Sequence, residues 1–378
     1  MRFALLTICV FFSVFVGCFR EDSDHSFEAT TIPSHGSALP RDICKLTDGT
    51  FIILGTKFHP SGDEDIFLAK INSNLDTVWT KTIDLIGNDY AESIQQSIDG
   101  GFIITGFARD WRTLASYDCF LLKTDPHGNP QWHKTYEGVR SGSSVVNTSD
   151  NGYLIAGSTI SDPYLFKTDI SGNVSWSKTY VDPVNGSFDD ICPLNDTTFF
   201  VAGSTSPPNS SWEVEVLKIN LNGDTIWAKY YGTSIGDVAQ NIKKCSDGSI
   251  IITAFTNDGY NSSMTAIRID QNGNEKWTVN SPIIGFPSDV ETTSNGGCTI
   301  LGSLDDPQGT INQNLDIIGM DSSGSIIWNK SYGSPQDEFP CAIISDVNSE
   351  YIILGGTGNE DNYSIFAIRI DDSGNRLK

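Results

Sequence analysis

The stretch LLKTDPHGNPQWHKTY (121–136) decides the fold, because variants of it recur along the chain. It joins an apolar run to a polar turn of the form Asp-x-x-Gly-Asn and then to a segment that carries a tryptophan. Two strand-forming segments joined by a turn that contains glycine are typical of a β-hairpin. A tryptophan follows such a turn six times along the chain, at Trp79, Trp132, Trp176, Trp227, Trp277 and Trp328.

These tryptophans lie 53, 44, 51, 50 and 51 residues apart, so the repeat period is about 50. A seventh turn, DDSGN (371–375), has no tryptophan after it. Upstream of each turn runs an apolar segment that ends in Gly or Ala, as in FIITG (102–106). Each copy therefore predicts four short strands, which in the second copy lie near residues 93–97, 102–105, 119–124 and 131–136.

Four-stranded antiparallel units at this period are typical of propeller blades. The sequence predicts an all-β fold, a seven-bladed β-propeller over residues 26–378. The chain ends where the outer strand of blade 7 would begin, while Phe27 lies 52 residues before Trp79, at the tryptophan position of the repeat. We expect residues 26–32 to complete blade 7 and close the ring, and the six repeat tryptophans to pack between blades.

Charge and amino-acid composition argue against two classes of protein. The chain of 378 residues has a net charge of −23, which excludes a simple nucleic-acid binder because phosphate binding needs a basic face. With 35 glycines, 11% aromatic residues and only 3 methionines, it is also unlike a helical bundle.

The N-terminus predicts export. Residues 1–17, MRFALLTICVFFSVFVG, read as a signal peptide, because Arg2 precedes an apolar run too short to span a bilayer comfortably. FVGC (15–18) resembles the lipobox of bacterial lipoproteins, which implies lipidation of Cys18 and a tether over residues 18–25. We expect an outer-membrane lipoprotein that faces the periplasm or the cell surface and touches the membrane only through its lipid. An ordinary cleaved secretory peptide is the alternative.

The composite repeat S-I-x-x-S-x-D-G-G-F-I-I-T-G … D-x-F-L-x-K-T-D-x-x-G-N-x-x-W-x-K-T-Y resembles that of β-propeller lipoproteins and cell-surface proteins of Bacteroidota-type bacteria. The resemblance covers about residues 27–378 and implies export, but no activity. The acidic FREDSD (19–24) is similar to the stretch after the lipid-bearing cysteine of surface-exported members. Residues 121–136 also resemble pyrroloquinoline-quinone-type repeats, which occur in quinone enzymes and in non-enzymatic outer-membrane assembly lipoproteins.

We find no catalytic constellation in the sequence, and we expect no catalytic residue, cofactor or metal ion. The five histidines lack metal-ligand spacing. The innermost strands carry a mixture without an obvious acid pair, namely Gln95, Gln96, Asn147, Lys243, Lys244 and Glu291. Hairpin stabilisation explains the Asp-rich turns, and calcium binding by them is the alternative.

Cysteine spacing allows few disulfides. The body has six cysteines and no blade holds more than one, so a disulfide would have to join two blades. Cys44 and Cys341, on inner strands of the adjacent blades 1 and 7, are the one pair we consider. Buried free thiols are the alternative.

Aromatic residues that break the repeat are the candidate binding residues. Trp111 and Trp212 fall in the loops between the second and third strands of blades 2 and 4, and Tyr260 falls in the same loop of blade 5. Arg109 and Arg112 flank Trp111 and add positive charge. These loops emerge on one face of a propeller, together with the connections between blades. We expect this face to bind an extended ligand across blades 2–4, over the short loop 158–163 of blade 3. Loop anchors are the alternative reading of these aromatics.

The sequence therefore favours a non-enzymatic, monomeric binding or scaffold propeller, whose ligand is a glycan or an envelope protein. Two other readings stay open. One is a propeller enzyme, either a quinone-dependent dehydrogenase or a polysaccharide-cleaving enzyme, and the other is an assembly factor for outer-membrane proteins.

Overall fold

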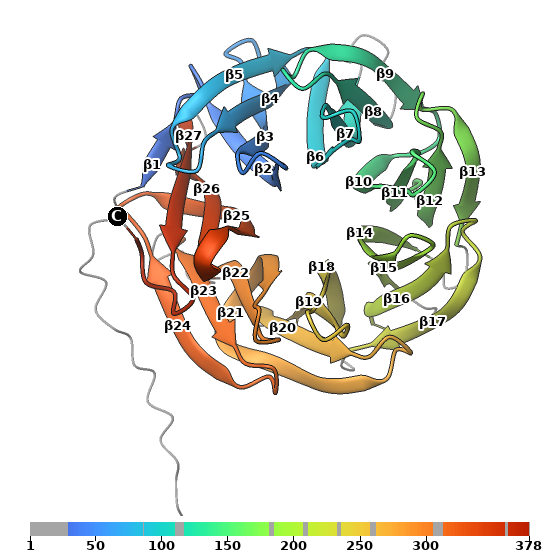
Figure 1. Ribbon diagram of the computed structural model, residues 1–378, viewed down its shortest axis with the longest axis vertical. Coiled ribbons are helices and arrows are strands. Elements are labelled where there is room, and N and C mark those ends of the chain that lie inside the picture. The colour runs from blue at the N-terminus through green and yellow to red at the C-terminus, as the bar shows by residue number, and fades with distance from the viewer. Residues whose placement is uncertain are drawn as a thin grey trace, which may run out of the picture.

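The computed structural model describes residues 29–85, 87–109, 117–180, 185–206, 211–232, 236–257, 262–304, 313–359 and 362–377. Within these residues the chain forms seven four-stranded antiparallel blades arranged in a ring around an open centre (Figure 1). The prediction of an all-β, seven-bladed propeller is confirmed. No helix in the described part of the chain is long and apolar enough to cross a bilayer.

Each blade runs from an innermost strand beside the axis to an outermost strand at the periphery of the ring. In that order, blade 1 has β2 (Ala38–Lys45), β3 (Phe51–Phe58), β4 (Glu64–Ile71) and β5 (Thr77–Ile83); blade 2 has β6 (Asn88–Gln96), β7 (Phe102–Arg109), β8 (Asp118–Thr124) and β9 (Pro130–Tyr136); blade 3 has β10 (Ser141–Asn147), β11 (Tyr153–Ser158), β12 (Pro163–Thr168) and β13 (Val174–Thr179); blade 4 has β14 (Gly186–Asn195), β15 (Thr198–Thr205), β16 (Glu213–Asn220) and β17 (Thr225–Tyr231). Blade 5 has β18 (Asp237–Lys244), β19 (Ile250–Asn257), β20 (Ser262–Ile269) and the first part of β21 (Glu275–Thr292). Blade 6 has the second part of β21, β22 (Cys298–Leu304), β23 (Leu315–Met320) and β24 (Ile326–Tyr332). Blade 7 has β25 (Asp337–Ser345), β26 (Tyr351–Asn359) and β27 (Asn362–Ile370), with β1 (Thr30–Ile32) outermost.

The ring closes through the N-terminal strand, as the sequence predicts. β1 pairs antiparallel with β27, with Thr30 opposite Ala367 and Ile32 opposite Ile365. Ile32 is buried in the cluster between blades 7 and 1. The repeat does not predict the course of β21, which continues from the outer strand of blade 5 into the inner strand of blade 6, so that these two blades form one seven-stranded sheet.

Apolar residues on both faces of the second and third strands fill the space between blades. The run FIIT of β7 is buried throughout, because each face of a blade meets a neighbouring blade. Each cluster of buried residues therefore draws on adjacent blades, such as the one with Ile52 and Leu54 of blade 1 and Phe102 and Ile104 of blade 2. The core is a ring of such clusters around the axis.

The repeat tryptophans pack against the turn of the next blade. Trp79 lies against Gly128, where an added Cβ would sit 2.9 Å from its Cη2 atom. The same contact joins Trp132 to Gly172, Trp176 to Gly223, Trp227 to Gly273, Trp277 to Gly324 and Trp328 to Gly374. Glycine is needed at these turns because φ is positive and because the indole ring leaves no room for a Cβ atom.

One turn departs from this pattern. In blade 1 the glycine position is held by Leu75, whose φ is 66°. No tryptophan precedes this turn in the ring, because the outer strand before it is β1. Leu75 instead packs into the cluster that contains Ile32 and Ile365. Phe27, which we expected at the tryptophan position, lies outside the described residues.

The six body cysteines are free thiols, so the pairing of Cys44 with Cys341 is not formed in the structure. All except Cys341 are buried. Burial raises the pKa of Cys119 to about 12, and it has the same effect on Cys44 and Cys298. Because the thiolate is the reactive form, these residues serve as core packing.

Candidate functional site

A cavity of about 1050 Å³ occupies the open centre of the ring. Its wall is made by the innermost strands, and all seven blades contribute residues to it. Cavities of this size at the centre of a closed fold can enclose most of a small ligand. We therefore take this cavity and its mouth as the candidate site.

A β-bulge on every inner strand turns one extra side chain toward the cavity. In β2, for example, the pairing with β3 shifts register between Pro40 and Asp42. A bulge of this kind bends a strand and re-aims a side chain. The seven extra residues all line the cavity: Arg41, Glu92, Ser143, Asp189, Gln240, Ser288 and Cys341. They form a polar ring in which neighbouring blades contribute different chemistry, and we call these seven residues the bulge ring.

The residue after the bulge ties one blade to the next. Asp42 accepts hydrogen bonds from the N–H of Ile43 at Oδ1 (2.7 Å) and from the N–H of Ile94 in blade 2 at Oδ2 (2.9 Å). Asp190 does the same with Ile191 and Ile242, and Asp289 with Val290 and Ile343. These three carboxylates are structural links between blades, because both oxygens of each are used by backbone donors.

The electrostatics of the wall follow from its burial. Burial raises the pKa of Asp42 to about 7, that of Asp189 to about 7 and that of Asp289 to about 6. Burial lowers the pKa of Lys243, but the nearby carboxylates, first Asp289 and Glu291 and then Asp190 and Asp42, together outweigh it and raise the pKa above its ordinary value. Lys243 therefore stays charged at the centre of an acidic wall.

The charged side chains of the wall have partners. Arg41 of blade 1 forms an ion pair with Glu92 of blade 2, and Lys243 Nζ lies 3.5 Å from Glu291 Oε2. Asp189 accepts hydrogen bonds from the hydroxyls of Ser187 and Ser204. These charged side chains are thus held in position by their partners, and their remaining donors and acceptors can form hydrogen bonds with a ligand.

Partly exposed aromatic side chains of blades 2, 5, 6 and 7 lie at the mouth of the cavity, on the face that carries the loops between second and third strands. Phe107, Phe286 and Phe339 line the cavity itself, and Phe286 is 39% exposed. Each has an aromatic neighbour at the same face, with ring centroids 4.9 Å apart for Phe107 and Tyr90, 5.1 Å for Phe286 and Phe255, and 5.7 Å for Phe339 and Tyr363. We call Tyr90, Phe107, Phe255, Phe286, Phe339 and Tyr363 the aromatic rim.

The predicted binding residues fall at this face where the structure describes them. Trp212, just before β16, is 42% exposed, and its carbonyl accepts the N–H of Asp237 at 2.8 Å. Its backbone is therefore anchored while its ring stays available. The guanidinium of Arg109 lies 5.5 Å from the ring centroid of Tyr117. Trp111, Arg112 and Tyr260 lie outside the described residues, as does Cys18 with the segment 1–28.

Sequence reasoning missed three parts of the site. The sequence showed no obvious acid pair on the innermost strands, and it did not single out Asp42, Asp190 and Asp289, which lie on them. An Asp followed by Ile or Val recurs at this strand position in blades 1, 4 and 6, and that pattern could have revealed them. The bulge ring could not be found from the sequence, because the bulge is set by pairing with the neighbouring strand. The residues of the aromatic rim cannot be told from core residues in the sequence, because they lie in strands together with the apolar residues of the core.

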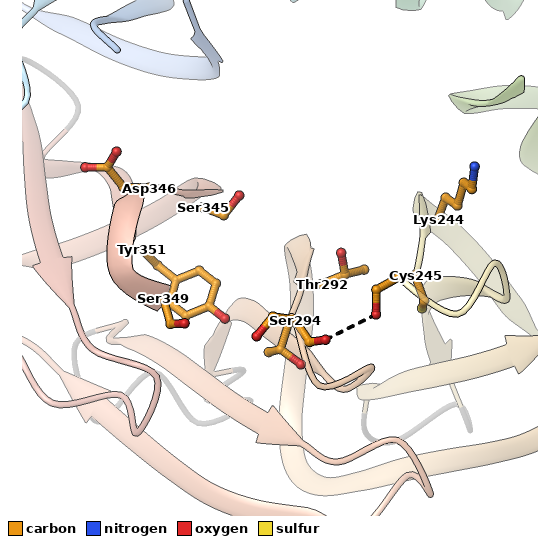
Figure 2. A pocket seen from close by; sticks show the side chains of 10 residues that line it. Lys244, Cys245, Thr292, Ser294, Ser345, Asp346, Ser349 and Tyr351 are labelled. Carbon is orange, nitrogen blue, oxygen red and sulfur yellow. Dashed lines mark hydrogen bonds between the residues drawn. The ribbon is translucent and has the colours of Figure 1, made fainter. Parts of the chain in front are cut away.

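A second pocket of about 490 Å³ lies at the opposite ends of the inner strands of blades 5 to 7. Figure 2 shows side chains from these blades around it, among them Thr292, Ser294 and Tyr351. The two charged side chains that Figure 2 labels at this pocket have partners that do not line it. Asp346 forms an ion pair with Arg369, and Lys244 donates a hydrogen bond to the carbonyl of Leu194 at 2.9 Å. This pocket has no aromatic rim among the residues that line it, so the central cavity remains the stronger candidate.

No protein-family profile matches the chain, and no curated protein is similar to it. Solved structures do share the fold. A protein of unknown function from Dyadobacter fermentans is 8% identical, with 90% of this chain and 96% of that chain covered and a TM-score of 0.55. Drosophila Plexin A, in complex with Semaphorin 1b, is 7% identical over 91% of this chain and 87% of that chain, with a TM-score of 0.55.

A protein of unknown function from Bacteroides caccae is 14% identical over 78% of this chain and 94% of that chain, with a TM-score of 0.47. Identities this low show the propeller fold alone. The function has to be argued from the cavity and its mouth.

Proposed function

We propose that the protein is an exported, non-enzymatic binding propeller that takes a glycan at the aromatic mouth of its central cavity. The observation that supports this is the combination of the aromatic rim with the polar bulge ring below it. Aromatic faces stack on the apolar faces of sugar rings, and carboxylate, guanidinium, amide and hydroxyl groups form hydrogen bonds with sugar hydroxyls. Arg41, Glu92, Asp189 and Gln240 supply such groups at different points around the axis.

Trp212 and Arg109 extend the same face. Trp212 presents a ring that the scaffold leaves 42% exposed, and exposed tryptophans are favoured anchors at binding surfaces. The proposed ligand lies across the mouth from blade 2 toward blades 4 to 6, where it contacts Phe107, Trp212 and Phe286. An envelope protein is the second ligand class, and a binding panel separates the two.

The test is a binding panel with the mature chain, using purified glycans and envelope proteins. We expect saturable binding of a glycan, and hydrogen exchange of the complex slowed at the strand ends that carry the aromatic rim. Protection confined to the opposite face, or binding of an envelope protein and no glycan, would contradict the proposal.

We also propose that the chain is a lipoprotein anchored through Cys18, as FVGC (15–18) suggests. Metabolic labelling with a fatty-acid analogue is expected to mark the wild-type protein and to leave Cys18→Ser unlabelled. Equal labelling of both proteins would show that the anchor is elsewhere, and no labelling of either would favour the cleaved secretory peptide.

A further inference from the structure

Three carboxylates meet at the junction between blades 1 and 2, on the face of the aromatic rim. Asp65 lies in β4, Asp84 follows β5, and Asp89 lies in β6. One ligand oxygen from each lies within 4.8 Å of those of the other two. Asp65 and Asp89 are buried, whereas Asp84 is exposed, so an ion can reach the cluster from solvent.

Asp65 is a buried member of the cluster, and only one of its two carboxylate oxygens has a hydrogen-bond partner among the described residues. Its side chain is only 9% exposed, and its Oδ2 lies 2.9 Å from Nε2 of His59. Its Oδ1 is buried and has no hydrogen-bond partner among the described residues, and the same is true of Oδ1 of Asp63. Burial raises the pKa of Asp65, and the neighbouring carboxylates of Asp84 and Asp63 raise it as well. A buried oxygen in this position is costly unless a cation binds it.

The next junction of the ring provides an internal comparison. Alignment of the repeats through their strand pairing places Asp118, Glu137 and Arg140 at the positions of Asp65, Asp84 and Asp89, respectively. The fold therefore does not require an acid at the third position. At the junction between blades 1 and 2 the third position holds Asp89 in place of an arginine. Asp89 Oδ2 accepts a hydrogen bond from the N–H of Leu85, and His59 contacts Asp65, so a cation bound here would offset the negative charge that the third acid adds.

We propose that Asp65, Asp84 and Asp89 bind one calcium ion. Donor sets made of carboxylate oxygens select hard cations. Calcium–oxygen distances of about 2.3–2.6 Å allow ligand oxygens up to about 5 Å apart, and the three oxygens here lie within 4.8 Å of one another. Calcium accepts irregular sets of oxygen ligands, whereas magnesium requires a nearly ideal octahedron and gives up its water reluctantly. The ion neutralises the junction and ties β4 to β6, next to Tyr90 of the aromatic rim.

This site differs from the expectation that the protein holds no metal, and it also differs from the Asp-rich turns considered for calcium. In those turns the carboxylates are used by the hairpin itself. Asp125, for example, accepts hydrogen bonds from the N–H groups of His127 and Asn129 and from the side chain of Asn129. The calcium proposal is independent of the proposed glycan binding.

The test uses the mature chain, stripped with EDTA and titrated with calcium chloride in a calorimeter, with melting temperatures recorded with and without about 5 mM calcium. We expect one calcium site with a dissociation constant of about 0.1–1 mM, the range of extracellular calcium-binding modules. We also expect calcium to raise the melting temperature by several degrees. Asp84→Asn is expected to weaken calcium binding at least tenfold without changing the melting temperature in EDTA, because Asp84 is exposed. Glu137→Gln, the matched change at the next junction, is expected to bind calcium like the wild type.

A second variant, Asp65→Asn, tests the buried carboxylate of the site. In EDTA it is expected to melt at or above the temperature of the wild type, because it removes a buried carboxylate of which only one oxygen has a partner, and it is expected to lose the response to calcium. The absence of saturable calcium binding by the wild type would overturn the proposal. So would unchanged affinity in Asp84→Asn, or equal affinity for magnesium and calcium.

Discussion

Deleting residues 19–32 is expected to open the ring and to destabilise the whole protein. The deletion removes β1, whose residues Thr30–Ile32 pair with Ile365–Ala367. It leaves β27 as a free strand edge and removes the buried Ile32 side chain, a change of about 2–5 kcal/mol before the lost backbone hydrogen bonds are added. Since native proteins have a total stability of about 5–15 kcal/mol, we expect aggregation or a melting temperature lower by at least about 10 °C.

The matched control deletes only residues 19–25, which we assign to the tether. This shorter deletion leaves β1 in place and is expected to melt like the parent chain and to elute as the same species in size-exclusion chromatography. A 19–32 deletion that melts within about 2 °C of the parent would show that the ring does not depend on this closure.

Replacing Gly223 by alanine is expected to lower the free energy of unfolding by about 2–4 kcal/mol. Its φ of 73° disfavours any residue with a Cβ atom, at about 1 kcal/mol, and the added Cβ would sit 2.6 Å from Cη2 of Trp176. Overpacking of this kind adds about 1–3 kcal/mol. Urea unfolding measures the change.

Gly138→Ala provides the control. Gly138 has a similar φ of 81°, but an added Cβ would meet nothing within 4 Å. We expect Gly138→Ala to lower the free energy of unfolding by about 1 kcal/mol, which is the cost of the positive φ alone. Equal destabilisation by the two substitutions would contradict the packing role that we assign to the repeat tryptophans.

The repeat explains why the fold was predictable. One unit, written seven times, carries its turns, its buried strands and its tryptophans in the local sequence, and Phe27 at the tryptophan position pointed to the closing strand. Leu75 was less predictable, because its environment depends on β1, which joins the last blade of the ring. The continuous β21 across blades 5 and 6 likewise reflects a connection between blades, and the repeat pattern says little about connections.

The candidate site was predictable only in part. The loop aromatics stood out because they break the repeat, and Trp212 is indeed exposed at the expected face. Phe286 could not be recognised, since an aromatic residue at a strand end looks like core until its exposure is known. Arg41, Glu92 and Asp189 face the cavity because of bulges, and a one-residue shift of register changes the face on which a side chain lies.

If the aromatic mouth of the cavity binds the ligand, two substitutions of exposed apolar residues on opposite faces must differ in their effect on binding. Phe286 lines the mouth, whereas Ile98, which is 78% exposed, lies in the turn between β6 and β7 on the other face. For the glycan found by the panel, we expect Phe286→Ala to weaken the affinity at least tenfold by calorimetry, and Ile98→Ala to leave it unchanged. Unchanged affinity in Phe286→Ala, or an equal loss in both variants, would contradict the account.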